Sequence, residues 1–528
     1  MYKVLVSDPL AKEGVEVLEK NKDFSVTVKT GMKPEELKNI ISEFDGLLVR
    51  SETKVTKEIL DIAKNLKIIG RAGTGVDNID TKEASKKGIV VMNVPGGNTI
   101  SAAEHTVSML LSLSRNIPQA NASLKKKEWK KKDFVGVEVL GKIIGIIGLG
   151  KIGLEVAKRL LAFGMKVFVY DPFVSKERAL QLGVETTTLD ELFKNSDYIT
   201  IHTPKTESTK NLINSETIKK MKDGVRIVNC ARGGLIDEQA LAEALKSGKV
   251  KGAALDVFEK EPLTESPFFE MNNVIMTPHL GASTEEAQTN VSVEIAKQLE
   301  EYFINGTIRN AVNFPYIPSE VFQKMQPYIA LSEKLGSFAS QLMDGRILSI
   351  GMAYSGEVTK YDLSPITIAA VKGMLEPVSE EGTLNFINAS FIAQDKGIKV
   401  SESRMPDMTD YSNIISVKLK TENGESIVAG TVFGKKYIRI VKINDYYVDV
   451  ELTENILAFS NADKPGVVGK IGTILGKNSI NIAAMEVGRK TVGGDAITIV
   501  NVDMPIPEKV LAEIKSQPEI KNVKMIKL

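Results

Sequence analysis

A glycine motif that joins an apolar strand to a helix constrains this chain more than any other feature of its sequence. The apolar segment 143–147 is β-branched and of strand length, and the motif Gly148-Leu-Gly150-Lys-Ile-Gly153 follows it directly. A helical pattern comes next, and a second apolar segment then ends in Asp171. This succession of strand, glycine turn, helix and strand predicts a Rossmann-like nucleotide-binding domain.

Each part of the motif has a chemical reason. Gly148 permits the tight turn, Gly150 lets the backbone approach a pyrophosphate, and Gly153 lets the helix pack on the strand. The helix N-terminus offers free N–H groups and the positive end of its dipole to the phosphates. Asp171 is placed to accept hydrogen bonds from a ribose 2′-hydroxyl, which favours NAD over NADP. Because a bare GxGxxG also occurs in ordinary glycine-bearing turns, the flanking strands and the acid carry the prediction.

The length and composition indicate a cytoplasmic globular protein of several domains. At 528 residues the chain is expected to hold about three to four domains. The net charge of +1 gives no global electrostatic attraction to nucleic acid or to a membrane. We find no signal pattern and no apolar run long enough to span a bilayer. The single cysteine, Cys230, excludes an internal disulfide and a cysteine metal cluster, and three scattered histidines make a histidine metal site unexpected.

The order of predicted elements divides the chain into α/β units followed by α+β units. Residues 1–98 and 285–312 are expected to form a flavodoxin-like substrate-binding domain, and 99–284 the nucleotide-binding domain. Two long helices join them, opened by predicted capping boxes at Ser101–Glu104 and Ser283–Glu286. Residues 313–452 predict an α+β intervening domain. Residues 453–528 alternate as strand, helix, two strands, helix and strand, the βαββαβ plan of a ferredoxin-like domain.

Polar residues follow successive predicted strands of the second unit. Ligands bind at the carboxyl ends of the strands of an open parallel sheet. Besides the glycine loop and Asp171, these segments are His202-Thr203-Pro204, Ala231-Arg232-Gly233-Gly234, Asp256 to Pro262, and Pro278 to Gly281.

Among them, Arg232, Glu261 and His279 suit hydride transfer next to a carbonyl carbon. A histidine, with a pKa near about 6.5 in water, can take a hydroxyl proton as hydride leaves the same carbon. A carboxylate on the other ring nitrogen would orient the ring. An arginine offers a planar fork to a carboxylate and charge to a developing alkoxide.

Each of these residues also has an ordinary interpretation. Glu261 is a solvated loop charge, Arg232 a surface cation and His279 a packed loop histidine if each is taken alone. Three such residues at strand ends that face one nucleotide site favour the chemical interpretation. His105 lies inside an apolar helical stretch, which predicts a core or interface residue.

At this point the residues resemble a known family. The motifs GLGKIG, HTP, VNCARGGLIDE, ALDVFEKEP and TPHLGAST, in that order, resemble the NAD-dependent D-2-hydroxyacid dehydrogenases. Residues 459–489 resemble the ACT regulatory domain, and the resemblance is weakest over 316–450. Together they imply the long form of this family, which oxidises 3-phospho-D-glycerate with NAD to 3-phosphohydroxypyruvate, the first step of L-serine biosynthesis. L-serine is then the expected allosteric effector.

The resemblance assigns roles to named residues. It makes Arg232, Glu261 and His279 the catalytic set. The implied cofactor residues are Thr74, Gly148, Gly150, Lys151, Ile152, Gly153, Asp171, His202, Thr203, Pro204, Cys230, Ala231 and Asp256. The implied substrate residues are Arg50, Ser51, Arg71, Gly73 and Asn98. The implied effector residues are Asn461, Asp463 and Asn481.

Alternatives remain for several of these positions. Arg50 and Arg71 are also compatible with ordinary solvation at strand ends, and Asp463 with a simple helix N-cap. The basic run around Lys130 and Lys131 is either a solvated loop or a phosphate contact in the cleft of a second subunit, since the resemblance implies a homodimer or homotetramer. A glyoxylate/hydroxypyruvate reductase is the same-family alternative, and a NAD-sensing scaffold without catalysis is the alternative from another class.

Overall fold

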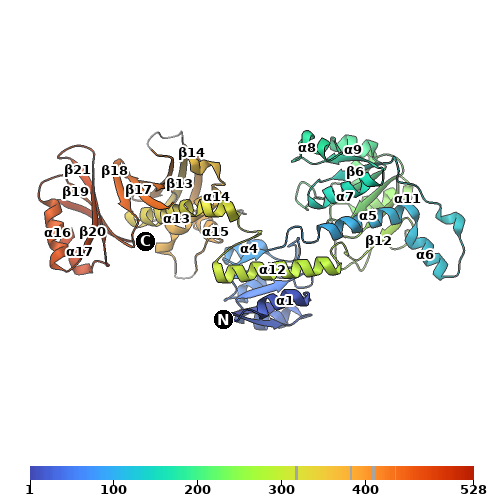
Figure 1. The fold of residues 1–528 in the computed structure, drawn as a ribbon, viewed down its shortest axis with the longest axis horizontal. Coiled ribbons are helices and arrows are strands. Elements are labelled where there is room, and N and C mark those ends of the chain that lie inside the picture. Colours follow the sequence, from blue (N-terminus) through green and yellow to red (C-terminus); the bar gives the residue numbers. More distant parts are fainter. Residues whose placement is uncertain (316–318, 381–382, 406–410, 435) are drawn as a thin grey trace.

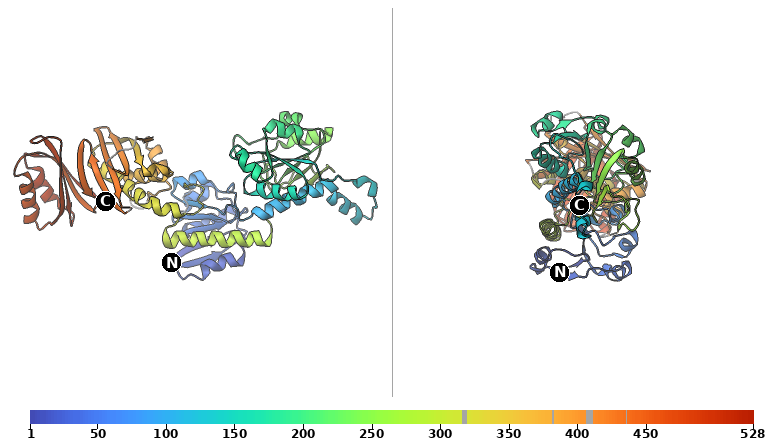
Figure 2. Two further views of the ribbon diagram at one scale, coloured as in Figure 1. Left: turned by 45° about the horizontal axis from the view of Figure 1, so that its top comes forward. Right: turned by 90° about the vertical axis from the view of Figure 1, so that its right-hand side faces the viewer.

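The computed structural model describes residues 1–315, 319–380, 383–405, 411–434 and 436–528. The molecule is elongated, with an α/β unit in the middle (Figures 1 and 2). A second α/β unit lies at one end and two further sheets lie at the other. None of the described helices is long and apolar enough to cross a membrane.

The middle unit is a parallel sheet in the strand order β2-β1-β3-β4-β5. Its strands are β1 (Tyr2–Val6), β2 (Phe24–Val28), β3 (Gly46–Val49), β4 (Ile68–Arg71) and β5 (Val90–Met92). Its helices are α1 (Lys12–Glu19), α2 (Pro34–Ile40), α3 (Lys57–Ile62) and α4 (Thr81–Lys86), joined from far along the chain by α12 (Glu285–Asn305). This order is that of flavodoxin-like folds, as predicted for the first domain.

The end unit is a parallel sheet in the order β12-β11-β10-β9-β6-β7-β8. Its strands are β6 (Ile143–Ile147), β7 (Lys166–Tyr170), β8 (Glu185–Thr186), β9 (Tyr198–Ile201), β10 (Val225–Asn229), β11 (Val250–Leu255) and β12 (Val274–Met276). Its helices are α5 (Thr99–Arg115), α6 (Ile117–Lys125), α7 (Lys151–Ala162), α8 (Lys176–Gln181), α9 (Leu189–Asn195), α10 (Ser215–Lys220) and α11 (Glu238–Ser247). The strand order reverses between β6 and β9, which is the Rossmann switch point, and the predicted fold class is confirmed.

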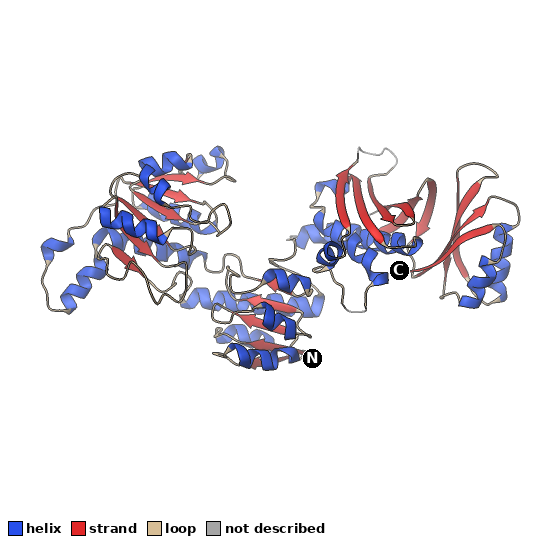
Figure 3. Ribbon diagram, turned by 180° about the vertical axis from the view of Figure 1, so that it is seen from behind, coloured by secondary structure: helices blue, strands red, loops and turns tan. Residues whose placement is uncertain are grey.

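Both parallel sheets have helices on their two faces (Figure 3). This explains why strands such as β6 are continuous apolar runs rather than alternating ones, since both faces of a covered parallel sheet are buried. The apolar side chains of β6 from Ile144 to Ile147 are at most 1% exposed.

The two capping boxes expected from the sequence are wrong. Helix α5 begins at Thr99 after Asn98, so Ser101 lies inside the first turn, where its hydroxyl donates to the carbonyl of Gly281 at 2.8 Å. Helix α12 is capped by Thr284, whose extended backbone lets its hydroxyl accept from the N–H of Ala287 at 3.2 Å. Ser101 is thus used for a tertiary contact, and Thr284, one residue later than expected, has the extended backbone and side-chain bond of an N-cap.

The C-terminal half contains two more sheets. One has the order β14-β13-β15-β16-β17-β18 and the other, antiparallel, the order β20-β21-β19-β22. The first comprises β13 (Ile347–Gly356), β14 (Lys399–Arg404), β15 (Asn413–Thr421), β16 (Gly424–Phe433), β17 (Tyr437–Ile443) and β18 (Tyr446–Glu451), with α13 (Ser319–Leu342), α14 (Ser364–Leu375) and α15 (Ala389–Asp395). The second comprises β19 (Asn455–Ala462), α16 (Val467–Lys477), β20 (Ile482–Arg489), β21 (Asp495–Val502), α17 (Glu508–Lys515) and β22 (Ile520–Lys527), the predicted βαββαβ plan.

The two C-terminal sheets share one hydrophobic core. Helices α16 and α17 cover one face of the four-stranded sheet (Figure 3). Its other face contributes Ile456, Ala458 and Ile499 to the cluster that contains Leu331 and Leu335 of α13. The two C-terminal domains therefore pack as a unit. That unit touches the middle domain where Asn385 Nδ2 donates to the carbonyl of Gly88 at 2.8 Å.

Candidate active site

The glycine loop between β6 and α7 has the form that a pyrophosphate site requires. Gly148 has a φ of +94°, and Gly150 is the N-cap of α7. A Cβ on Gly153 would lie closer than 3.0 Å to the carbonyl oxygen of Gly148, whereas a Cβ on Gly150 would meet no described atom within 4 Å. The loop is thus tightly packed beneath Gly153 and open above Gly150, with the residues Lys151 and Ile152 in the first turn of the helix.

Asp171 lies at the end of β7 and holds the glycine loop. Its carboxylate accepts from the N–H of Leu149 at 2.7 Å and from the N–H of Phe173 at 2.8 Å. A bound ribose would meet a carboxylate whose position these two backbone bonds have already set.

The segment after β9 closes the same edge of the sheet. His202 Nε2 contacts Thr200 Oγ1 at 3.0 Å, and burial lowers the pKa of His202 to about 4, so the ring is neutral near pH 7. Thr203 Oγ1 is buried and finds no hydrogen-bond partner among the described residues. An unpaired buried hydroxyl beside the loop is a group that a ligand can satisfy. Pro204 follows on the exposed side.

Asn229, at the end of β10, shapes the turn that carries Arg232. The Asn229 amide donates to the carbonyl of Arg232 at 2.9 Å and accepts from the N–H of Ala231 at 3.0 Å. Cys230 is buried; this burial, with the nearby Asp256 charge, raises the pKa of its thiol to about 12. Cys230 is therefore a neutral packing residue near pH 7 and no nucleophile.

His279 and Glu261 form a close pair. His279 Nδ1 contacts Glu261 Oε2 at 2.7 Å, and Glu261 Oε1 accepts from the N–H of Phe258 at 3.0 Å. Burial by itself would raise the pKa of Glu261, but the bonds from His279 and Phe258 outweigh it and leave the pKa below its usual value. The carboxylate is thus ionised and can orient the imidazole.

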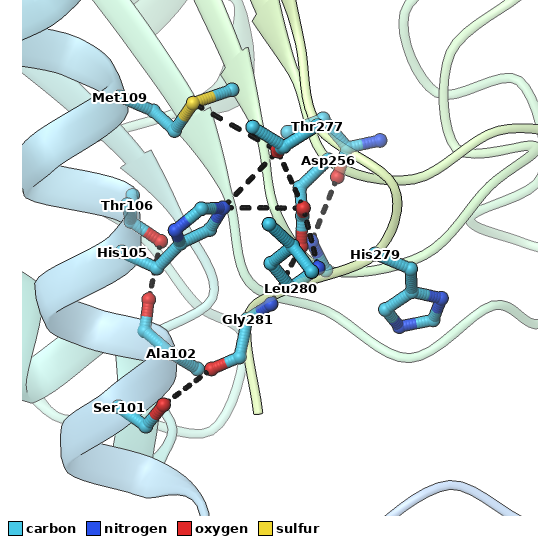
Figure 4. A network of polar contacts seen from close by, with 12 residues as sticks. Ser101, Ala102, His105, Thr106, Met109, Asp256, Thr277, His279, Leu280 and Gly281 are labelled. Atoms are coloured by element: carbon cyan, nitrogen blue, oxygen red, sulfur yellow. Dashed lines mark hydrogen bonds and ion pairs between the residues drawn. The ribbon is translucent and has the colours of Figure 1, made fainter. Parts of the chain in front are cut away.

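The predicted contact of Asp256 with the cofactor stays a prediction, and the structure shows a further role for this residue. It is fully buried, and its carboxylate bonds the loop that presents His279 (Figure 4). His279 itself points away from that network.

Three arginines, Arg50, Arg71 and Arg232, lie close enough for the charges of two of them to lower the pKa of the third. Arg71, at the end of β4, has a pKa lowered to about 10, first by burial and then by the positive charges of Arg232 and Arg50. Its Nε is buried and has no hydrogen-bond partner among the described residues. Arg232, in contrast, has a partner: its Nε lies 3.2 Å from Oδ2 of Asp77, which belongs to the middle α/β unit. Such a cluster of like charges suits an anion with more than one negative group.

The predicted substrate residues Gly73 and Asn98 and the predicted cofactor residue Thr74 lead from Arg71 to the start of α5. Gly73 has a φ of +149°, and a Cβ there would collide with the Arg71 guanidinium. Thr74 Oγ1 donates to Asn98 Oδ1 at 2.8 Å, which ties the glycine turn to the start of α5. Ser51 is exposed beside Arg50. The sequence prediction missed Asp77 and Asn229, although both are polar residues at strand or turn ends.

The predicted effector residues do not meet in one place. Asp463 accepts from Gly493 N at 3.0 Å and from Arg489 Nη1 at 3.1 Å, and these two bonds, in that order, lower its pKa. The alternative interpretation, that Asp463 is a simple helix N-cap, is wrong, because Gly466 is the N-cap of α16. Asn481 donates to Asp503 at 2.7 Å at the opposite end of β21, so a single chain does not bring it to Asp463.

Asn461 is buried rather than open to a ligand. Its Oδ1 accepts from Thr498 Oγ1 at 2.7 Å and its amide donates to the carbonyl of Ala462 at 3.0 Å. Among the described residues, no group of three or more histidine, cysteine or acidic side chains is placed to hold a metal ion.

Comparisons with known protein families identify three parts of the chain. Residues 107–281 match the D-isomer specific 2-hydroxyacid dehydrogenase NAD-binding domain, 324–444 the D-3-phosphoglycerate dehydrogenase intervening domain, and 455–519 the ACT domain. The chain is 45% identical over 529 residues to D-3-phosphoglycerate dehydrogenase of Synechocystis sp., covering all of this chain and 95% of the relative. It is 44% identical to the Bacillus subtilis enzyme of that name, over the full length of both.

Solved structures resemble the first two units. D-lactate dehydrogenase of Aquifex aeolicus, complexed with NAD and lactic acid, is 32% identical with a TM-score of 0.53, covering 59% of this chain and 99% of that one. A glyoxylate reductase from Paecilomyes thermophila is 29% identical with a TM-score of 0.53, covering 59% and 98%.

Proposed function

The chain belongs to the D-3-phosphoglycerate dehydrogenases, the D-2-hydroxyacid dehydrogenases with an intervening and an ACT domain, and from this we propose its reaction in residue detail. The reaction is oxidation of 3-phospho-D-glycerate to 3-phosphohydroxypyruvate, the first step of L-serine biosynthesis. NAD is the cofactor, and when bound it accepts the hydride. The open face of Gly150 and the unpaired hydroxyl of Thr203 support binding of its phosphates at the loop before α7.

His279 acts as the acid/base. Its Nε2 takes the hydroxyl proton of the substrate while Glu261 holds the opposite ring nitrogen, a division of work that general acid–base catalysis requires. The observation that carries this proposal is the 2.7 Å contact between His279 Nδ1 and the ionised Glu261 carboxylate.

The arginines bind the substrate. Arg232 meets the C1 and C2 oxygens, while Arg50 and Arg71 supply the positive charge that a phosphorylated acid demands. The unpaired, buried Nε of Arg71 supports this role, since a buried donor without a partner is costly unless a ligand completes it. Gly73 and Asn98 line the same approach, and the predicted cofactor residue Thr74 donates to Asn98.

Turnover of candidate hydroxyacids by the purified protein tests the proposal. With NAD, kcat/KM should be highest for 3-phosphoglycerate and lower for glycerate and lactate. His279→Ala should lose about 10²–10⁴-fold in kcat while NADH binding, followed by fluorescence, persists. Glu261→Gln should lose activity, whereas the exposed neighbour Glu259→Gln is the matched control. Near-normal kcat in His279→Ala would refute the assignment.

The same assay separates the alternatives. A higher kcat/KM for glyoxylate or hydroxypyruvate reduction would favour a glyoxylate/hydroxypyruvate reductase, the function named for one similar structure. NADH binding without turnover of any tested hydroxyacid would favour a NAD-sensing scaffold.

L-serine inhibits the enzyme through the ACT domain. A zwitterion offers an ammonium group to Asp463 and a carboxylate to backbone N–H groups and Arg489, which already contacts Asp463. Because that loop is remote from the cleft, inhibition acts as a coupling free energy between sites. Asn481 would join only from a second copy of the chain.

Calorimetry and inhibition assays test this regulation. Asp463→Ala should abolish serine inhibition and spare uninhibited turnover. Glu519→Ala, which removes another surface ion pair of the same domain, should leave inhibition intact. Absence of serine binding to the wild type would refute the proposed regulation. Point variants are preferable to removal of residues 453–528, because truncation would expose the shared core.

The active enzyme is a cytoplasmic homodimer or homotetramer that needs no nucleic acid or membrane partner. Helix α6 projects from the end of the molecule (Figure 1); Leu124, in its last turn, and Trp129, which follows it, are 57% and 83% exposed. A second copy covering this arm would bring Lys130 or Lys131 to its cleft as a phosphate contact, although Lys130 now pairs with Glu128 at 2.9 Å. Sedimentation of the wild type and phosphoglycerate KM of Lys130→Ala and Lys131→Ala test this.

A further inference from the structure

His105 lies outside the catalytic set, yet its ring meets a buried carboxylate next to that set. The residue is on α5, with its side chain 19% exposed. Its Nε2 lies 3.1 Å from Asp256 Oδ1 and 3.2 Å from Thr277 Oγ1 (Figure 4). Asp256 is fully buried. A buried charge persists only where it is hydrogen-bonded, so each of these contacts matters to the carboxylate.

The direction of these bonds follows from the chemistry of the groups. An ionised carboxylate only accepts, so Nε2 of His105 must carry a hydrogen whether or not the ring is charged. The hydroxyl of Thr277 donates to Asp256 Oδ1 at 2.6 Å, so its oxygen remains free to accept from the same Nε2–H. His105, Thr277 and Asp256 therefore form one connected unit.

That unit sets the loop that carries His279. Asp256 accepts from the N–H of Leu280 at 2.7 Å and from the N–H of Gly281 at 2.8 Å, while its own carbonyl accepts from the N–H of His279 at 2.9 Å. His279 has a φ of +56°, which non-glycine residues rarely adopt and which persists only when neighbouring bonds impose it. The hydrogen bonds between Asp256 and the backbone of residues 279–281 impose this conformation.

Helix α5 also reaches from this loop to the predicted substrate side. One turn before His105, Ser101 donates to the carbonyl of Gly281 at 2.8 Å. Asn98, which precedes the helix, accepts from Thr74 of the middle domain at 2.8 Å. A single rigid helix thus contacts both the substrate turn and the loop of His279.

We propose that His105 is a positioning residue for proton transfer. By holding Asp256 and Thr277 it keeps the 277–281 loop in the one conformation that points His279 at Glu261, and α5 keeps that loop in register with the substrate side of the cleft. The inference rests on the proposed role of His279 and adds to it a residue that touches neither substrate nor cofactor.

Three variants of the full-length enzyme test it. His105→Leu keeps a side chain of similar volume and removes the Nε2–H donor. His105→Gln places an amide N–H near the Nε2 position and should restore activity. Ser114→Ala is the matched control, since Ser114 is a buried polar residue of the same helix that bonds Tyr198 and not the loop.

His105→Leu should lower kcat about 10- to 100-fold, the range expected for a displacement near 1 Å of a catalytic group. The phosphoglycerate KM should change little, and the isotope effect on kcat with 2-deuterated substrate should rise because the chemical step becomes slower. His105→Gln should recover most of the kcat. Ser114→Ala should alter only the melting temperature.

Wild-type kcat and isotope effect in His105→Leu would overturn the inference, as would a loss confined to melting temperature. If His105→Leu fails to fold, the kcat values of His105→Gln and His105→Asn are compared instead. The shorter side chain of asparagine cannot reach Asp256, so His105→Asn should have the lower kcat. Equal kcat values in the two variants would overturn the inference. Normal turnover in His279→Ala would refute the proposed function itself, and loss in His279→Ala with none in His105→Leu would refute only the positioning role.

Discussion

Gly150 and Gly153 of the loop before α7 have opposite surroundings, so the same substitution should have opposite consequences. A Cβ on Gly153 would press on the carbonyl oxygen of Gly148 and lie 3.5 Å from the Cβ of His202. Neither neighbour can rotate away, because one is backbone and the other is fixed to it. A Cβ on Gly150 meets no described atom within 4 Å, and its φ of −66° suits alanine.

The expected magnitudes follow from these contacts. Gly153→Ala must move α7 off the sheet, an overpacking cost of about 1–3 kcal/mol. For a domain of this size that is a fall of roughly 2–12 °C in melting temperature. Gly150→Ala should be neutral or slightly stabilising, by up to about 1 kcal/mol. Its methyl group would stand where the pyrophosphate approaches, and loss of one charge-assisted hydrogen bond of about 1.5–3 kcal/mol weakens NADH binding roughly 10- to 150-fold.

Calorimetric scans and NADH fluorescence titrations measure both quantities, and each variant is the control for the other. Gly150→Ala should have the melting temperature of the wild type and a lower affinity for NADH. Gly153→Ala should have a lower melting temperature. Unchanged NADH affinity in Gly150→Ala would show that the cofactor does not approach this loop, and an unchanged melting temperature in Gly153→Ala would refute the packing argument.

Three further outcomes are expected. Asp171→Asn should shrink the preference for NAD over NADP, measured as the ratio of kcat/KM values, because it removes a charge that repels a 2′-phosphate but keeps an acceptor for the loop; an unchanged ratio would contradict this. Asp77→Asn should lower the KM for 3-phosphoglycerate by up to about five-fold, since it frees Arg232 from an exposed ion pair that contributes at most about 1 kcal/mol; a raised KM would argue that Asp77 helps rather than competes. Burial alone would raise the pKa of Asp256, but bonds from His105, Thr277 and Leu280 bring it below its usual value. A carboxyl with a lowered folded-state pKa stabilises above its unfolded pKa of about 3.9 and loses that stability as pH falls. The melting temperature of the wild type should therefore drop more steeply below pH 4 than that of Asp256→Asn, and parallel curves would disprove the assignment.

Local sequence patterns predict the fold class and the order of the nucleotide-binding elements, and the structure agrees with both. Glycine spacing, β-branched strands and helical periodicity are local properties, and the order β6, glycine loop, α7, β7 and Asp171 follows from them. Since parallel strands share one carboxyl edge, the sequence also placed Arg232, Glu261 and His279 on the same side of the sheet. The 2.7 Å distance between Glu261 and His279 is consistent with that expectation.

Contacts between segments that are distant in the chain determine which of these groups are paired, buried or apart. His105 and Asp256 are 151 positions apart in the chain, and no local pattern encodes their contact. Helical periodicity marks an apolar face but not the partner against which it packs, so the sequence alone indicates only that His105 is a core or interface residue. Strand register and domain packing are likewise set by contacts between distant segments. For this reason the sequence does not show that Asn481 and Asp463 lie at opposite ends of β21, or that the two C-terminal sheets share one core.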